Sequence, residues 1–218
     1  MRESIPDRLL ASVRAVWNSI VSQLSKDNRR FIIGHAVKGA RGSDLEDAVH
    51  WLTSAGILHR VCRLSRAELP LSAFEEPNSY KLYFCDVGLM RTRAGFPLES
   101  IINPSDDTGF FRGAMAENYV LTELKSSGFE EPFYWTSEGR AEVDFVVNIR
   151  DKVVPIEVKS NDRFRAKSLG VFVDTYPDCV PAVVSGKGLR MGKVTNIPLS
   201  MAWMLGDLLD PADKDASD

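Results

Sequence analysis

The stretch Glu142–Ser160, EVDFVVNIRDKVVPIEVKS, predicts a β-hairpin that turns at residues 150–151. Folding the stretch about that turn places Asp144 directly opposite Glu157. Residues that face each other in an antiparallel pair share one face, with Cβ atoms roughly 4.5–5.5 Å apart, so two like charges there are destabilising. A cation between the two carboxylates would reverse that sign. The hairpin therefore predicts a metal-carboxylate site.

A lysine and a further glutamate belong to the same predicted surface. The register that pairs Asp144 with Glu157 also places Glu142 opposite Lys159. The alternative interpretation is a set of plain surface ion pairs on a half-exposed sheet. Pro155 is the weak point of the register, because proline cannot donate to a strand ladder and often marks an edge or a bulge.

A further acidic group comes from a predicted helix before the hairpin. The stretch GAMAENYVLTELKSSG, residues 113–128, repeats apolar residues at helical spacing, and Glu117 falls within that apolar stripe. A buried carboxylate is costly unless it is paired or bound to a metal. Carboxylate oxygens suit Mg²⁺ (or Mn²⁺), which binds one or two protein carboxylates together with waters and phosphate oxygens. Such a site activates a water for phosphoryl chemistry, and a nearby lysine orients that water or neutralises developing charge.

The overall charge gives no sign of a large basic surface. The 218 residues carry 27 Lys and Arg against 30 Asp and Glu, a net charge of −3. Basic residues gather locally after the second hairpin strand, where Arg163, Arg165 and Lys167 are candidate contacts to nucleic-acid phosphates. A solvated run of charges is the alternative interpretation.

Several other classes of protein are disfavoured by the sequence. The segment GKGLRMGK, residues 186–193, has the wrong spacing for a phosphate loop. The three cysteines form no CxxC pair, and no apolar run is long enough to cross a membrane. We therefore expect a cytoplasmic protein that makes no use of a membrane.

The first 90 residues predict a winged-helix-like region. The pattern favours helices at 6–24, around 29–36 and at 43–56, the last capped by Ser43, then strands at 57–65 and 80–90 with a turn at 86–88. In a winged helix the third helix can read a DNA groove. Acidic residues at the front of that helix suit DNA phosphates poorly, so a packing module is the alternative.

The rest of the chain predicts an α/β fold. Residues 91–112 are rich in Gly, Pro, Asn and Asp and indicate a linker or mobile loop. Residues 113–208 predict a second domain, and residues 209–218 a disordered acidic tail. The order helix, three strands, helix and strand predicts a mixed sheet flanked by helices.

Four motifs in order resemble the DUF4143 family: YKLYFCDVGLM (80–90), GAMAENYVLTEL (113–124), FYWTSEGRAEVDFVV (133–147) and PIEVKS (155–160). That family is found behind an AAA+-type ATPase domain in bacterial and archaeal proteins, and its members resemble PD-(D/E)xK nucleases in fold. The resemblance covers roughly residues 80–205 and implies a restriction-endonuclease-like domain. Because this chain has no phosphate loop, we expect no ATPase activity from it.

The resemblance also implies roles for four residues. Asp144 stands at the first acidic position, Glu157 and Lys159 form the (D/E)xK pair, and Glu117 is the helix carboxylate. It implies a Mg²⁺-dependent nuclease in which Asp144 and Glu157 hold the metal, Glu117 assists, and Lys159 positions a water. The alternative is a non-catalytic DNA-binding or protein-interaction module that works with an AAA+ ATPase module.

Overall fold

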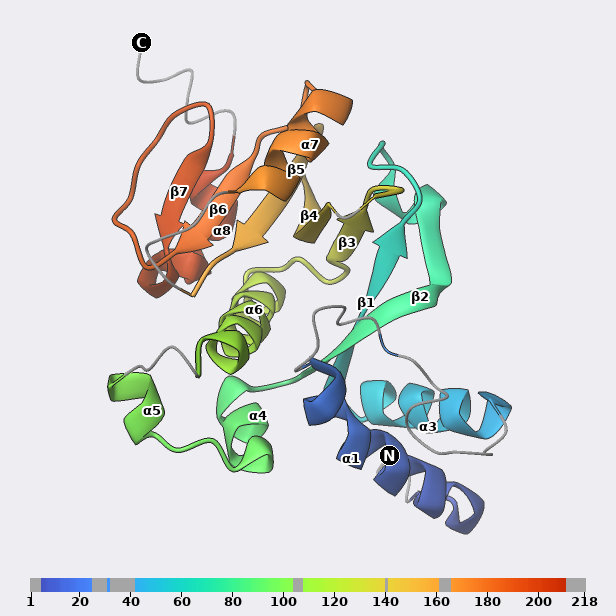
Figure 1. Cartoon of the computed structure of the whole chain (residues 1–218). Helices are drawn as coiled ribbons and strands as arrows, with labels where there is room; N and C mark the ends of the chain where they lie inside the picture. Colours follow the sequence, from blue (N-terminus) through green and yellow to red (C-terminus); the bar gives the residue numbers. More distant parts are fainter. Residues whose placement is uncertain are drawn as a thin grey trace.

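One seven-stranded mixed sheet forms the centre of the molecule (Figure 1). The computed structural model describes residues 5–24, 31, 42–103, 108–139, 141–160 and 166–210. The strands lie in the order β2-β1-β3-β4-β5-β6-β7. Their bounds are β1 Leu58–Leu64, β2 Glu75–Phe84, β3 Phe133–Thr136, β4 Glu142–Ile149, β5 Lys152–Val158, β6 Ala182–Ser185 and β7 Thr195–Pro198.

Helices flank this sheet, as the sequence predicted. The α-helices are α1 Leu10–Leu24, α3 Gly42–Ser54, α4 Val87–Ala94, α5 Glu99–Ile102, α6 Gly109–Ser126, α7 Lys167–Thr175 and α8 Leu205–Leu208. Short 3₁₀ helices are η1 Asp7–Leu9, η2 Leu71–Phe74 and η4 Leu199–Met204. Helices α6 and α7 both contact β5, the strand that carries the candidate Glu157 and ends one residue before Lys159.

The N-terminal hairpin is part of the same sheet as the second half of the chain. Strands β1 and β2 pair antiparallel, and β1 then pairs parallel with β3. Strands β3, β4 and β5 are antiparallel neighbours, whereas β5, β6 and β7 run parallel. The strands expected to form a separate wing therefore form one side of the shared sheet, and the stretch 91–112, expected as a linker, contains the end of α4 and all of α5.

Two local expectations differ from the structure. The expected turn at 86–88 is the start of α4, where the Asp86 carboxylate accepts a hydrogen bond from the Leu89 backbone N–H at 2.7 Å. That bond satisfies one of the free N–H groups at a helix start, which is why Asp86 begins a helix. Ser43 lies inside the first turn of α3, because this helix begins at Gly42.

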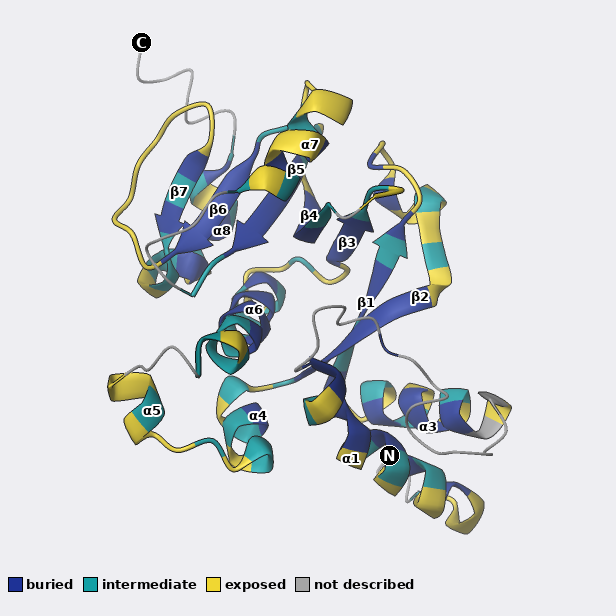
Figure 2. Cartoon of the chain, in the orientation of Figure 1, coloured by how far each residue is buried: buried dark blue, intermediate teal, exposed yellow. Residues whose placement is uncertain are grey.

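The apolar periodicity of the sequence corresponds to the core. On α3 the side chains of Leu45, Val49 and Leu52 are buried. On β5 the apolar face, formed by Val154, Ile156 and Val158, is buried as well (Figure 2). Burying such faces supplies most of the stability of amphipathic elements. Of the helix expected around 29–36 only Phe31 is described, and most of the expected acidic tail also lies outside the described residues.

Both outer strands of the sheet have backbone groups that bond to other segments. On β2, the Tyr80 carbonyl accepts from the Phe31 N–H at 2.8 Å. At the end of β2, the buried Asn118 side chain of α6 bonds both the N–H and the carbonyl of Phe84, at 2.8 and 3.0 Å. On β7, Asn196 exchanges two backbone bonds of 2.9 Å with Arg190 of the preceding loop.

Candidate functional site

The hairpin of β4 and β5 has the predicted register. Phe145 lies opposite Ile156, and the pairing continues without a shift to the turn, where Arg150 has a φ of 55°. Pro155 does not disturb this ladder. Val153 and Lys159, at the same alternation as Pro155, direct their backbone bonds to the side of β6 rather than β4.

The ladder between β4 and β5 ends at the pair Phe145–Ile156, next to the candidate acid Asp144. Three steps along β4, from Val143 to Val146, match only two steps along β3, so β4 carries an extra residue at this point. The Asp144 carboxylate accepts a hydrogen bond of 2.8 Å from the Val158 backbone N–H. A side chain thus takes the place of the carbonyl that a continuing ladder would offer. This bond fixes the carboxylate of Asp144 against β5, one position from Glu157.

Glu157 is a buried acid with an incomplete set of partners. Its side chain is 6% exposed, and its Oε1 lies 2.6 Å from the Lys159 Nζ. Its Oε2 is buried, and no described group forms a hydrogen bond with it. Burial, and then the charge of Asp144, raise the pKa of Glu157 from 4.5 to about 7, although Lys159 acts in the opposite direction. The predicted proximity of the two carboxylates is therefore present in the structure.

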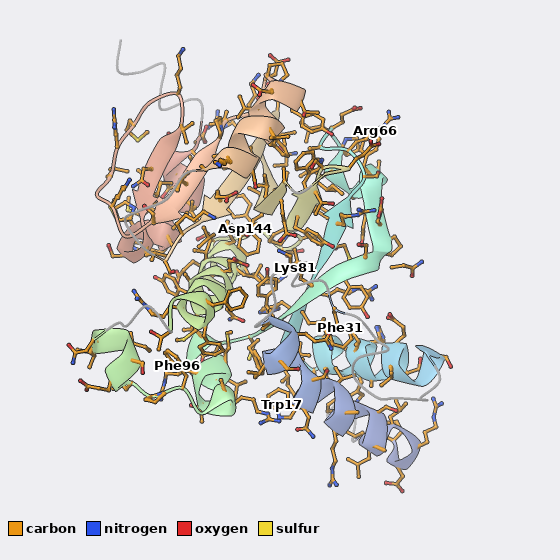
Figure 3. All side chains as sticks on the ribbon, in the orientation of Figure 1. Trp17, Phe31, Arg66, Lys81, Phe96 and Asp144 are labelled. Atoms are coloured by element: carbon orange, nitrogen blue, oxygen red, sulfur yellow. The ribbon has the colours of Figure 1, made fainter. Side chains whose placement is uncertain are left out.

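The predicted pair of Glu142 with Lys159 is wrong. Glu142 forms its ion pair with Lys81 of β2, whereas Lys159 pairs with Glu157. The physical reason is the extra residue in β4, which ends the β4–β5 ladder before Glu142. Figure 3 shows Asp144 on β4 and Lys81 on β2 toward the middle of the molecule.

Lys81 is a residue of the site that the sequence did not predict. Its side chain is fully buried, and its Nζ lies 4.9 Å from the centre of the Tyr134 ring, a cation–π contact. Burial lowers the pKa of Lys81, but the nearby Tyr83, Glu142 and Asp144 outweigh that effect and raise it overall. Lys81 is therefore a permanent positive charge near Asp144. The available signal was a lysine between apolar residues in a strand, YKLYF.

Glu117 is buried on α6, as its place in an apolar stripe predicted. Its Oε2 accepts a hydrogen bond of 3.3 Å from the Tyr83 hydroxyl. Tyr83 in turn lies close enough to influence the pKa of Lys81, which also responds to Asp144. Tyr83 of β2 thus bonds the helix carboxylate and also acts electrostatically on the buried Lys81.

The carboxylates of Asp144 and Glu157 meet part of the requirement of a hard divalent cation for oxygen ligands. Among the residues described, no three His, Cys, Asp or Glu side chains are grouped so that together they could hold a metal ion. Mg²⁺ needs only one or two protein carboxylates beside its waters. The unbonded Oε2 of Glu157 next to Asp144 is such a pair, and a bound cation would supply the missing partner of this buried oxygen.

The basic residues after the hairpin are placed only in part. Arg163 and Arg165 lie outside the described residues. Lys167 is exposed at the first position of α7. Within the described part of the chain, no helix is both long and apolar enough to pass through a membrane.

Comparison with known families gives two matches that together span most of the chain. Residues 1–100 match DUF8612, a domain of unknown function. No curated protein matches the chain. Residues 112–201, which contain Glu117, Asp144, Glu157 and Lys159, match DUF4143, a domain of unknown function, in agreement with the resemblance of the sequence motifs.

Proposed function

We propose that this chain is a metal-dependent phosphodiester hydrolase that acts on nucleic acid. The observation that carries the proposal is the buried Glu157 carboxyl, which has one oxygen on Lys159 and the other without a described partner beside Asp144. A buried carboxylate pair is expensive unless a cation neutralises it. The site therefore favours a cation, and the adjacent ammonium favours an anionic substrate.

Each residue has a distinct role in this proposal. Asp144, oriented by the Val158 N–H, and Glu157, through its Oε2, would hold Mg²⁺ or Mn²⁺. When bound, the metal supplies an activated water and stabilises charge on the phosphoryl group. Lys159, held by Glu157, orients that water or neutralises developing charge. Glu117 assists from α6 through Tyr83.

The motif pattern supports the same proposal. The order of Glu117, Asp144 and the Glu157–Lys159 pair is that of the PD-(D/E)xK nucleases that the DUF4143 motifs resemble. An AAA+-type ATPase module stays a predicted partner, by the same resemblance. The alternative, a non-catalytic DNA-binding or protein-interaction module, predicts binding without cleavage.

The test is cleavage of single-stranded and duplex DNA and RNA with Mg²⁺ or Mn²⁺. We expect the wild-type chain to cleave at least one of these substrates. We expect Glu157→Gln and Lys159→Met each to lose at least about 100-fold in rate, because the first removes a proposed metal ligand and the second removes the ammonium that orients the water or neutralises developing charge. Asp151→Asn, at the exposed hairpin turn, is the matched control and keeps full activity. Absence of cleavage by the wild type, or cleavage that both site variants retain, contradicts the proposal.

Metal binding has a readout that does not depend on activity. Mn²⁺ is expected to raise the melting temperature of the wild type, because a ligand that binds only the native state stabilises it by mass action. Glu157→Gln is expected to show no such shift, whereas Asp151→Asn shifts like the wild type. Equal shifts in all three proteins, measured by differential scanning fluorimetry, would place the metal elsewhere.

A further inference from the structure

An open pocket lies beside β6, under the loop that joins β6 to β7. Its volume is about 520 Å³, and Figure 2 shows the loop as a long exposed segment at the side of the sheet. Three of the lining residues are basic, Lys187, Arg190 and Lys193, and none of the lining residues is acidic. In the described part of the chain, no carboxylate forms an ion pair with Arg190 or Lys193. The pocket is therefore a locally basic surface on a chain with a net negative charge.

The loop that forms this pocket has a defined shape. The Asn196 side-chain amide donates to the carbonyls of Lys187 and Gly188, at 3.2 and 2.9 Å. The Ser185 hydroxyl donates to the Asn196 Oδ1 at 2.7 Å, and two backbone bonds join Asn196 to Arg190. One asparagine on β7 thus fixes the first half of the basic segment, from Lys187 to Arg190. Cations held in this way lose less conformational entropy on binding than those of a free loop.

The pocket lies on the same face of the sheet as the candidate site. Val183 of β6 lines the pocket, and it is the direct neighbour of Glu157 in the parallel pairing of β5 with β6. Neighbours at the same register point to the same face, and adjacent strands lie about 4.8 Å apart. A polyanion that occupied the pocket would therefore have its next segment within reach of Glu157 and Lys159.

We propose that the loop 186–194 binds the phosphate backbone of a nucleic-acid strand and directs it toward Glu157. This inference rests on the proposed function, since it assigns the substrate path to the same site. Leu189 and Met191, two exposed apolar residues of the loop, lie between the cations in the sequence, and exposed Val194 follows the last of them. These apolar residues would contact sugars and bases while the cations contact phosphates.

The test is binding without metal, so that the candidate metal site takes no part. Fluorescence anisotropy of a labelled oligonucleotide in EDTA compares the wild type with the triple variant Lys187→Gln, Arg190→Gln, Lys193→Gln. The control triple variant, Arg8→Gln, Arg14→Gln, Arg66→Gln, removes the same charge from exposed positions elsewhere. We expect the pocket variant to bind at least about 10-fold more weakly, with a salt dependence reduced by about 2 to 3 in slope, and the control to bind like the wild type. Circular dichroism checks that both variants are folded.

The outcomes separate this inference from the proposed function. Lost binding in the pocket variant, with no cleavage by the wild type, supports the pocket and contradicts the hydrolase. If the wild type cleaves nucleic acid and the pocket variant cleaves it with an unchanged KM, the proposed role of the pocket is wrong and the proposed hydrolase stands. Equal weakening in both triple variants, or no oligonucleotide binding by the wild type, also overturns it. The proposal is also overturned if the chain binds phosphatidylserine vesicles through the pocket and binds no oligonucleotide, because the loop would then be a membrane-surface contact.

Discussion

At the scale of single residues, Glu157 makes stability depend on pH. Its pKa is raised from 4.5 to about 7, chiefly by burial, so the folded state favours the neutral acid. The contribution of Glu157 to the free energy of unfolding is fully present below pH 4.5 and is lost as the pH rises through about 7, because the folded state must then hold a buried charge. The free energy of unfolding attributable to Glu157 therefore falls across that window.

Glu157→Gln removes this titration. Without metal, we expect the variant to match the wild type near pH 4.5 and to exceed it at pH 8 by on the order of 2 kcal/mol, because its amide carries no charge. Urea unfolding in EDTA at both pH values measures the difference. Asp151→Asn, at an exposed acid, controls for a general charge effect, and an equal difference at both pH values would contradict the assignment.

Lys81 is the second residue with a large expected effect. Lys81→Met keeps the buried stem but removes the ammonium that faces Glu142, whose side chain is 29% exposed. We expect a loss of roughly 1–3 kcal/mol in the free energy of unfolding, less than for a fully buried broken pair because water reaches Glu142.

Two further variants test that explanation. Adding Glu142→Gln to Lys81→Met is expected to recover part of the loss, because the charge left unpaired at Glu142 is then also removed. Lys167→Met, at an exposed lysine of α7, is expected to change stability by less than about 0.5 kcal/mol. Urea unfolding measures the free energy of unfolding of each variant. If Lys81→Met is as stable as the wild type, the ion pair of Lys81 with Glu142 adds nothing to stability.

At the scale of elements, Asn118 joins α6 to the end of β2. It supplies the hydrogen bonds of the Phe84 N–H and carbonyl, and both its own side chain and Phe84 are buried. Asn118→Ala leaves these groups unpaired, so we expect a loss of roughly 2–4 kcal/mol. The exposed Asn148→Ala is the control. Hydrogen exchange gives a local check: the Phe84 amide is expected to exchange faster in Asn118→Ala, and a protected amide would contradict this account.

The sequence predicted most elements because their signals are local. Apolar spacing placed α1, α3 and α6, and alternation placed the strands of the hairpin. The proximity of Asp144 and Glu157 was equally local, since one turn sets the register of both strands. The pair of Lys81 with Glu142 was not predictable in this way, because these residues are 61 positions apart and β1 and β3 join their strands into one sheet. The start of α4 was missed because Asp-Val-Gly also fits a turn.

At the scale of the whole molecule, the two matched regions share one sheet. Arg63 of β1 bonds Glu76 of β2 and the Thr136 hydroxyl of β3, across the junction between them. We therefore expect one cooperative unfolding transition. The test uses variants that keep tryptophan only at Trp17 or only at Trp135, with the others changed to Phe, and compares their urea midpoints. Coincident midpoints support a single unit, and two separate midpoints would show that the regions unfold independently.

The bonds on the outer strands have a consequence for solubility. An open strand edge is a template on which another chain can add, and growth of that kind leads to aggregation. Here Phe31 and Asn118 occupy backbone groups of β2, and Arg190 occupies those of Asn196 on β7. A strand added at these positions would have to break these bonds first, so they disfavour growth of the sheet from either edge by copies of this chain.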